Sequence, residues 1–351
     1  MKKRFSLAVL ALSSSLAFAA PFSIDGEVDI KIQPQSNGFA ALKPLQFKLP
    51  RVKISPDAKD YLVKQLKTYP RSNLQSHALM GELPPKVELG MEGTPVLNQG
   101  MHGSCVTFAT TAALDAVLGA GDYISPLCSL ELGSWLAIND KLDYSGWNGS
   151  WGPVVLDQMM KYGIISTNHQ KLHGCAGVNV YPLDNEEDEG HPMSEDEYAR
   201  YSVPISKLVE WKSLLNSADS FSPKTSPEQM VWMAKAQLAK GNRLTIGMFL
   251  DVNVGHAGAL GSYKAANDTW MITPQIILDA VYGDIYAGHE LVVTGYDDNA
   301  LVMDEEGNIN RGVFTLRNSW SKYAGDQGNY YVSYEHFAFF TDEIQVIRLK
   351  K

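Results

Sequence analysis

The chain has 351 residues, of which 45% are hydrophobic and 20% are charged, and its formal net charge is -9. This is an ordinary globular composition, with enough chain for one large domain or two small ones. Phosphate binding requires a basic face, and no basic cluster of that kind appears in the sequence, so the charge argues against nucleic acid as the main partner.

The N-terminus has the pattern of a secretory signal peptide over residues 1–19. Three basic residues at positions 2–4 precede an apolar segment over 5–18, and an A-x-A sequence ends at Ala19. A stable membrane anchor needs about 20 apolar residues, whereas serines interrupt this shorter run. We therefore expect cleavage after Ala19 and a secreted or periplasmic protein.

Residues 20–82 predict a β-hairpin followed by a helix. Apolar and polar residues alternate around Ile30 and again around Phe47, as in two strands. Ser55-Pro56-Asp57 has the N-cap, proline and first-turn acid of a helix that should run through Tyr69. A hairpin and one helix bury too little surface to fold alone, so this segment should pack on the rest of the chain.

The remaining chain predicts a helical half followed by a β half. Helices are expected from Cys105 to about 118, from Ser125 onward and over 154–162, then an amphipathic helix over 203–217 and one from Ser226 to 241. Strands should follow over 244–252, 268–272, 289–296, 312–317, 329–334 and 343–348. Their spacing suits a small antiparallel β-barrel.

Three local motifs carry residue types used in nucleophilic catalysis. Q-G-M-H-G-S-C (99–105) places Cys105 at the start of a helix, where unpaired N–H groups and the helix dipole favour a thiolate. G-H-E-L-V-V-T-G-Y (288–296) places His289 on a strand, and N-S-W (318–320) follows the next one. The intervening turn would bring His289 and Asn318 side by side, whereas the alternative base, His256, lies in a Gly/Ala loop.

From about residue 83 onward, these blocks resemble the papain-like (C1) cysteine peptidases, which carry Q-G-x-x-G-S-C, G-H-x-x-x-x-x-G-Y and N-S-W in this order. The resemblance implies an α+β fold with two subdomains, a helical left half and an antiparallel β-barrel right half with the cleft between them. It assigns catalysis to Cys105, His289 and Asn318, with Gln99 in the oxyanion hole. It places substrate at Gly103, Gly149, Ser150, Trp151, Gly288 and Trp320. No cofactor and no metal are expected.

The sequence departs from the family at several positions. In the family, a cysteine three residues before the nucleophile forms a disulfide with a second cysteine. In this sequence those two positions are His102 and Trp147, as expected if packing replaced that bond. Cys105, Cys128 and Cys175 remain, and the odd count suggests one pair and one free thiol. Because the nucleophile must stay free, the resemblance favours a Cys128 to Cys175 bridge. A metal site at His169, His173 and Cys175 is the rival interpretation, but residues 164–177 show no helical periodicity and offer no fourth ligand.

The resemblance implies a cysteine endopeptidase that is made as a zymogen and acts on proteins or peptides. Residues 20–82 would be its pro-region and inhibitor, and 83–351 its peptidase domain, with an acidic insertion near 184–200. The pro-region could instead be a permanent segment packed away from the cleft. Two other functions stay open: a non-hydrolytic acyl transferase or exopeptidase on the same fold, and a catalytically inactive binding scaffold.

Overall fold

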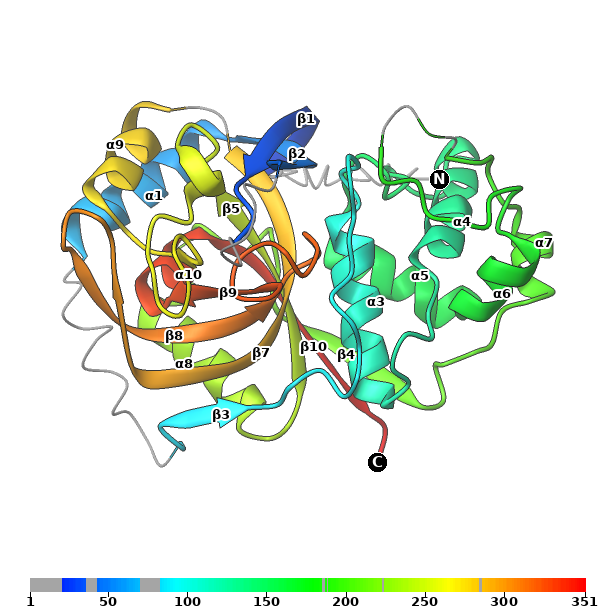
Figure 1. Cartoon of the computed structure of the whole chain (residues 1–351). Coiled ribbons are helices and arrows are strands. Elements are labelled where there is room, and N and C mark those ends of the chain that lie inside the picture. Colours follow the sequence, from blue (N-terminus) through cyan, green and yellow to red (C-terminus); the bar gives the residue numbers. More distant parts are fainter. Residues whose placement is uncertain are drawn as a thin grey trace, which may run out of the picture.

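The computed structural model describes residues 21–35, 43–69, 83–184, 187, 189–222, 224–283 and 286–351. The expected signal peptide, the chain between the predicted hairpin helix and the peptidase domain, and part of the acidic insertion therefore lie outside the described residues. No helix in the described ranges is long and apolar enough to cross a membrane. The described chain forms a helical half and a sheet half, with the N-terminal hairpin at their junction (Figure 1).

The helical half is built on α3, the helix that begins at the predicted nucleophile. Most of its side chains are buried, because small residues allow close packing on the sheet strands β5, β7 and β10. The other helices begin at a serine or at another residue with extended backbone, and the Ser125 cap of α4 is the one that the sequence predicted. The helices of this half are α3 (Cys105–Leu118), α4 (Pro126–Ile138), α5 (Gly152–Tyr162), α6 (Thr167–His173) and α7 (Glu195–Ala199).

The sheet half contains one curved sheet whose strands follow the order β4-β10-β5-β7-β8-β9-β6. Its pairs are antiparallel except for β6 with β9, which confirms the predicted α+β class. The strands are β3 (Lys86–Glu88), β4 (Val209–Leu215), β5 (Arg243–Leu250), β6 (Thr269–Trp270), β7 (Tyr286–Met303), β8 (Ile309–Arg317), β9 (Asn329–Ser333) and β10 (Thr341–Leu349). The helical segments of this half are α8 (Pro227–Leu238), η2 (Gly255–Gly258), α9 (Pro274–Tyr282) and α10 (Tyr334–Phe340).

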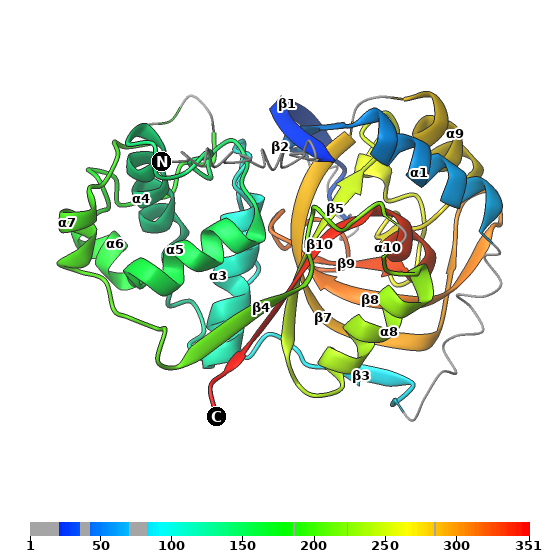
Figure 2. The same ribbon diagram turned by 180° about the vertical axis from the view of Figure 1, so that it is seen from behind.

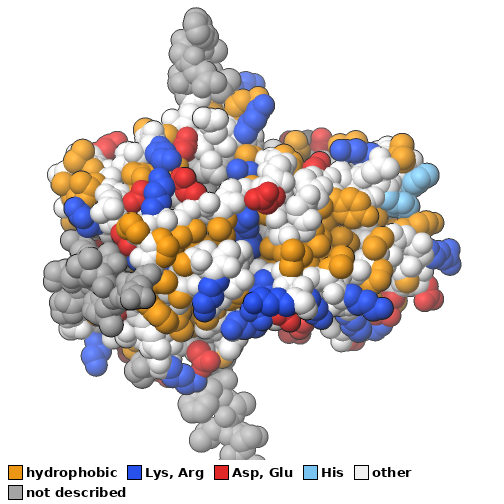
Figure 3. Space-filling view, turned by 90° about the horizontal axis from the view of Figure 1, so that it is seen from below, with side chains coloured by type: hydrophobic (Ala, Val, Ile, Leu, Met, Phe, Trp, Pro, Cys, Tyr) orange, Lys and Arg blue, Asp and Glu red, His pale blue; other side chains and the backbone are white. Residues whose placement is uncertain are grey.

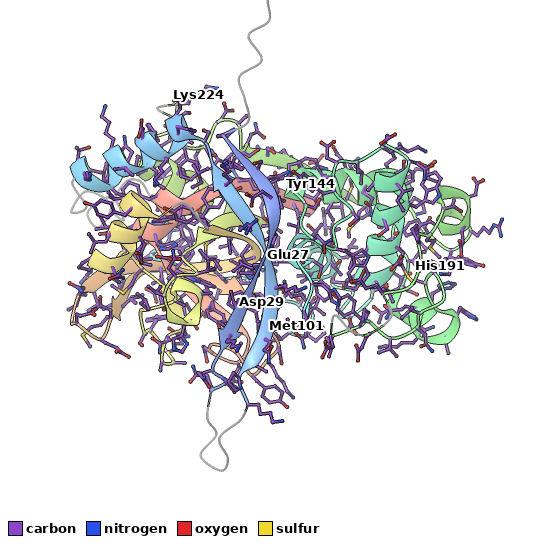
Figure 4. All side chains as sticks on the ribbon, turned by 90° about the horizontal axis from the view of Figure 1, so that it is seen from above. Glu27, Asp29, Met101, Tyr144, His191 and Lys224 are labelled. Carbon is purple, nitrogen blue, oxygen red and sulfur yellow. A yellow bond between two sulfur atoms is a disulfide. The ribbon has the colours of Figure 1, made fainter. Side chains whose placement is uncertain are left out.

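The predicted hairpin and helix are confirmed as β1 (Phe22–Ile32), β2 (Leu45–Ile54) and α1 (Pro56–Thr68). The strand β2 also joins the main sheet, because Arg51 and Val52 pair with the start of β7. The helix α1 lies beside α9 on the outside of the sheet half (Figure 2). Seen from above, the hairpin crosses the junction between the two halves (Figure 4).

Two sequence predictions about secondary structure are wrong. The helix expected over 203–217 is largely the strand β4, because pairing with β10 satisfies its backbone and outweighs the helical spacing of its apolar residues. Residues 164–177 contain the short helix α6, although no helical periodicity marks it. The sequence analysis also lacked the helices α9 and α10, although Thr273 and Ser333 cap them as good N-cap residues do.

The face opposite the hairpin carries side chains of mixed type (Figure 3). Lysine and arginine alternate there with acidic residues, and apolar side chains gather near the middle and over the helical half. This visible face therefore shows charges of both signs. The predicted catalytic residues lie instead at the junction that the hairpin covers.

Candidate active site

Cys105 is the first residue of α3 and its side chain is fully buried. Ser104 precedes it as the N-cap residue without a side-chain cap, because its hydroxyl pairs with the hydroxyl of Tyr181 at 3.0 Å. Tyr181 in turn donates to the Gln99 carbonyl at 2.8 Å. The loop before the nucleophile is thus held by side chains from the helical half.

His289 and Asn318 come from neighbouring strands, as predicted. His289 lies on β7, Asn318 directly follows β8, and His289 Nε2 lies 2.8 Å from Asn318 Oδ1. Asn318 Oδ1 also accepts from the Ser319 N–H at 2.7 Å, so this oxygen is an acceptor and His289 Nε2 carries the hydrogen. His289 Nδ1 is then the basic nitrogen, and it has no hydrogen-bond partner among the described residues.

Trp320 covers the bond between the histidine and the asparagine. Its ring stacks on the His289 ring with centroids 4.5 Å apart and planes at 19°. Trp320 is itself fully buried. The stacked indole fixes the plane of the imidazole and keeps water from its hydrogen bond with Asn318.

Gln99 forms two hydrogen bonds to the loop of Asn318 and one to the loop of Cys105. Its backbone N–H donates to the Ser319 carbonyl at 2.9 Å, and its Oε1 accepts from the Ser319 hydroxyl at 2.8 Å. Its Nε2 donates to the His102 carbonyl at 3.0 Å. The loop of Cys105 and the loop of Asn318 are therefore linked through one amide side chain.

A single pocket is lined by five of the ten predicted site residues. Cys105 and His289 line it together with Ser150, Trp151 and Gly288. Gly103, Gly149 and Trp320 adjoin it through the hairpin contacts described next. The rest of its described lining is Ile24, Pro50, Val52, Val106, Gly247, Phe249, Glu290, Asp342 and Glu343.

The hairpin lies directly over this pocket. The Gln99 amide donates to the Lys48 carbonyl at 3.2 Å, and the Gly103 N–H donates to Glu27 Oε1 at 3.2 Å. Phe47 stacks on Trp320 with ring centroids 5.6 Å apart. Glu27 is visible on β1 above the junction, with Met101 of the catalytic loop near it (Figure 4). The alternative in which this segment packs away from the cleft is therefore wrong.

Glycines in the site make the close approach of the hairpin possible. A Cβ atom on Gly149 would lie 2.9 Å from Ile24 Cδ1 and 3.0 Å from Pro50 Cβ, and the φ of Gly149 is +115°. A Cβ atom on Gly288 would lie 3.0 Å from a Val52 methyl group. A side chain at either position would push the hairpin away from the pocket.

Burial disfavours charge on both Cys105 and His289. Desolvation raises the pKa of the Cys105 thiol to about 12, against hydrogen bonding from the Glu290 backbone. Desolvation also lowers the pKa of His289 to about 4, although the bond to Asn318 acts the other way. The thiolate–imidazolium pair expected of a working site is therefore disfavoured while the hairpin is in place.

Packing takes the place of the disulfide that the family resemblance led us to look for. The rings of His102 and Trp147 meet edge to face with centroids 4.9 Å apart, and Trp147 stacks on Tyr181 at 5.7 Å. The expectation that packing replaced that bond is confirmed. Cys128 and Cys175 form the disulfide favoured above, and Cys105 is the free cysteine of the described chain.

The alternative metal and base residues lie elsewhere. His169 and His173 do share a face of α6, with ring centroids 5.0 Å apart, but Cys175 is in the disulfide and cannot be their third ligand. Among the described residues no group of three suitable side chains could hold a metal ion. His256 lies in η2, where Nε2 pairs with the Asn267 amide at 3.3 Å.

The predicted acidic insertion adjoins the loop before Cys105 through its described residues. Met101 N donates to the Leu183 carbonyl at 2.9 Å, just before the insertion. Within it, Glu189 Oε1 lies 3.2 Å from His102 Nδ1, and its side chain is 48% exposed. The insertion therefore flanks the loop that carries Cys105.

Sequence reasoning missed three acidic residues of the pocket, Glu290, Asp342 and Glu343. Glu290 directly follows His289 inside a strongly hydrophobic strand, where a carboxylate is unusual and could have served as a signal. The other two follow the unpredicted helix α10, so no sequence pattern placed them near Cys105.

The fold was compared with known proteins. Xylellain, a cysteine protease from Xylella fastidiosa, has 17% identity and a TM-score of 0.49 over 80% of this chain and 90% of that chain. The Amb a 11 cysteine protease, a major ragweed pollen allergen, in its proform, has 14% identity and a TM-score of 0.46 over 84% and 76%. Digestive procathepsin L 3 of Tenebrio molitor larval midgut has 15% identity and a TM-score of 0.44 over 84% and 79%.

These structural neighbours are papain-like cysteine proteases, the family that the motifs indicate, and the likeness is one of fold. No protein-family model and no curated protein matches the chain. Because the identities are low, the function is argued from the residues and distances of this chain.

Proposed function

We propose that this chain is the zymogen of a secreted cysteine endopeptidase, inhibited by its own N-terminal hairpin. Residues 1–19 are its signal peptide, 20–82 its pro-region and 83–351 its peptidase domain. The observation that carries the proposal is the Lys48 carbonyl on the Gln99 amide, within a group that also contains Cys105, His289 and Asn318. An inhibitory segment needs that position, because it occupies the place of a substrate carbonyl.

Removal of the hairpin lets water reach the pocket and reduces the desolvation that keeps Cys105 and His289 neutral. His289 Nδ1 then takes the thiol proton, and the thiolate attacks the carbonyl carbon of a peptide bond. The oxyanion receives hydrogen bonds from Gln99 Nε2 and from the Cys105 backbone N–H. His289 returns the proton to the leaving amine, and water hydrolyses the thioester with His289 as the base.

Asn318 and Trp320 act on the base and do not touch the substrate carbonyl. Asn318 holds the hydrogen on His289 Nε2, so that Nδ1 stays free to accept the thiol proton. Trp320 shields that bond by stacking on the imidazole ring. Both are positioning residues in this proposal.

Mass spectrometry of the purified full chain tests the proposal. The wild type is incubated with a thiol reductant at mildly acidic and at neutral pH, beside Cys105→Ala, and an epoxysuccinyl thiol-protease inhibitor is then added. We expect the wild type to lose its N-terminal part by a cut between residues 70 and 89 and to gain the inhibitor mass on Cys105. Cys105→Ala should do neither.

A matched pair of histidine variants sharpens the test. His289→Ala should abolish both events, whereas His256→Ala, which changes the other candidate base, should retain them. If Cys105 stays unlabelled after an added protease has removed the hairpin, the catalytic proposal is wrong. The chain is then a binding protein on a peptidase scaffold.

A further inference from the structure

The pocket beside Cys105 has a floor of three buried carboxyl groups. Glu290 comes from β7, and Asp342 and Glu343 come from β10. Their exposed fractions are 2%, 3% and 2%. The described lining of the pocket contains no lysine and no arginine, so no such side chain neutralises these acids within the pocket.

Two glycines lie against the carboxyl groups, and each is close to oxygens of two of them. A Cβ atom on Gly247 would lie 2.7 Å from Asp342 Oδ1 and 3.1 Å from Glu290 Oε2. A Cβ atom on Gly152 would lie 3.2 Å from both Glu290 Oε1 and Glu343 Oε1. Side chains at these positions would fill the floor, so glycine keeps the carboxyl oxygens accessible from the pocket.

The three carboxyl groups are unequally satisfied. Glu343 accepts from the Gly152 N–H at 2.7 Å and from the Gln345 amide at 3.3 Å. Glu290 Oε1 is buried and has no donor within hydrogen-bond distance among the described residues, although the Glu290 carboxyl group as a whole also interacts with the side chains of Thr245 and Glu343. A buried carboxylate oxygen without a donor is costly, and a ligand that brings N–H groups would remove that cost.

The hairpin closes the pocket with apolar groups and supplies no such donor. Ile24, Pro50 and Val52 form its share of the lining. Burial raises the pKa of Glu290 and Asp342 well above the usual range and that of Glu343 to about 7, which favours the protonated form of Glu290 and Asp342 in the closed form. Once the hairpin leaves, water enters and the carboxyl groups can ionise.

We propose that this pocket binds the side chain of a lysine or arginine close to the scissile bond, so that the enzyme cleaves peptides with a basic residue at that subsite. The inference rests on the proposed function. A guanidinium or ammonium group matches a cluster of carboxylates in charge and supplies several donors, one of which would reach Glu290 Oε1. Leucine or phenylalanine would leave the same acids buried and unpaired, which costs affinity.

Profiling of the activated enzyme with a peptide library tests the inference. The library varies each of four positions on either side of the cut. For the wild type, we expect one position within three residues of the cut at which arginine or lysine raises kcat/KM at least 10-fold over leucine, mainly through a lower KM. The preference should weaken with increasing salt, because opposite charges attract less at high ionic strength.

Charge-neutral variants connect the preference to the pocket. Glu290→Gln and Glu343→Gln should each lower the ratio of arginine to leucine cleavage by about 10-fold or more. Asp115→Asn is the matched control, since Asp115 is a buried carboxyl group in the third turn of α3, away from the pocket lining. It should leave the ratio as in the wild type.

The outcomes separate this inference from the proposed function. If the wild type cleaves the library but prefers leucine, phenylalanine or another neutral residue at every position, the basic-residue inference is wrong and the peptidase stands. An unchanged ratio in both glutamine variants would also overturn the inference. If no peptide is cleaved and Cys105 is not labelled, the proposed function itself fails.

Discussion

Phe47 is a buried hairpin side chain that packs on the predicted catalytic group through Trp320. It is 2% exposed and stacks on Trp320, which stacks in turn on His289. Replacing it by alanine leaves a cavity between the hairpin and the site, and a buried Phe→Ala change costs about 3 kcal/mol or more. The substitution destabilises the closed form alone, because the contact between Phe47 and Trp320 is already broken when the hairpin is open. The open fraction should rise about 100-fold, at 1.4 kcal/mol per factor of ten.

The open fraction can be read from the rate at which a thiol reagent labels Cys105 in the intact chain. The thiol is fully buried and its pKa is raised to about 12 while the hairpin is closed, so labelling requires opening. We expect Phe47→Ala to be labelled about 100 times faster than the wild type. Intact mass confirms that the labelled chains still carry the hairpin.

Leu136→Ala provides the matched control, since Leu136 is buried in α4 within the core of the helical half. It should lower the midpoint of thermal unfolding and leave the labelling rate near that of the wild type. Equal labelling rates for Phe47→Ala and the wild type would refute the idea that the hairpin limits access to Cys105.

Two further predictions concern catalysis and pH. Gln99→Ala should lower kcat of the activated enzyme about 10²- to 10³-fold with a smaller change in KM, because the variant lacks one oxyanion donor; an unchanged kcat on a peptide substrate would contradict that role. Burial raises the pKa of Asp115 from 3.8 to about 7, so the folded chain holds a proton that the unfolded chain has released. In the Cys105→Ala background, the free energy of unfolding should therefore fall by up to about 4 kcal/mol as pH rises from 4 to 7. Urea unfolding should show a weaker pH dependence when Asp115→Asn is added. Parallel plots of unfolding free energy against pH for the two chains would contradict this prediction.

The elements that the sequence predicted well are those with local signals. Ser55 accepts a hydrogen bond from Ala58 N, and Ser125 from Cys128 N, so both predicted N-caps are formed. The hairpin strands alternate with a period of two and pair along most of their length. The order of the catalytic motifs also carried information, since it led to His289 and Asn318 as a hydrogen-bonded pair.

Non-local contacts decided what the sequence could not reveal. The spacing of Trp211, Leu214 and Leu215 fits one face of a helix. In the structure their backbone instead pairs with β10 in an antiparallel sheet. The position of the hairpin over the site depends on contacts such as Glu27 with Gly103, which are 76 residues apart in the chain. The acidic floor likewise joins Glu290 to residues more than 50 positions later.

The direction of β2 explains, within our proposal, why the enzyme does not cut its own hairpin. Along β2, Lys48 meets the Gln99 amide and Pro50 lies against Gly149. The resemblance places Trp151, two residues after Gly149, at the pocket for the second substrate residue upstream of the cut, so a substrate chain would run from the Gly149 side towards Gln99. The strand β2 runs in the opposite direction, from Gln99 towards Gly149. The nitrogen that would leave on cleavage after Lys48 therefore lies on the side away from His289, which would have to protonate it.

Activation should consequently require a cut between residues 70 and 89 by a second molecule. On the C-terminal side this segment is held by β3, since Val87 pairs with Tyr296 and the Tyr296 hydroxyl donates to the Pro84 carbonyl at 2.6 Å. Tyr296 lies seven residues beyond His289 on β7, a separation of about 23 Å at 3.3 Å per residue. The same chain therefore holds the described C-terminal end of this segment, residues 83–89, away from its own nucleophile. We expect the initial rate of activation per molecule to rise in proportion to protein concentration, and trace active enzyme to process Cys105→Ala; a half-time that stays constant over a 30-fold dilution would show cleavage within one chain instead.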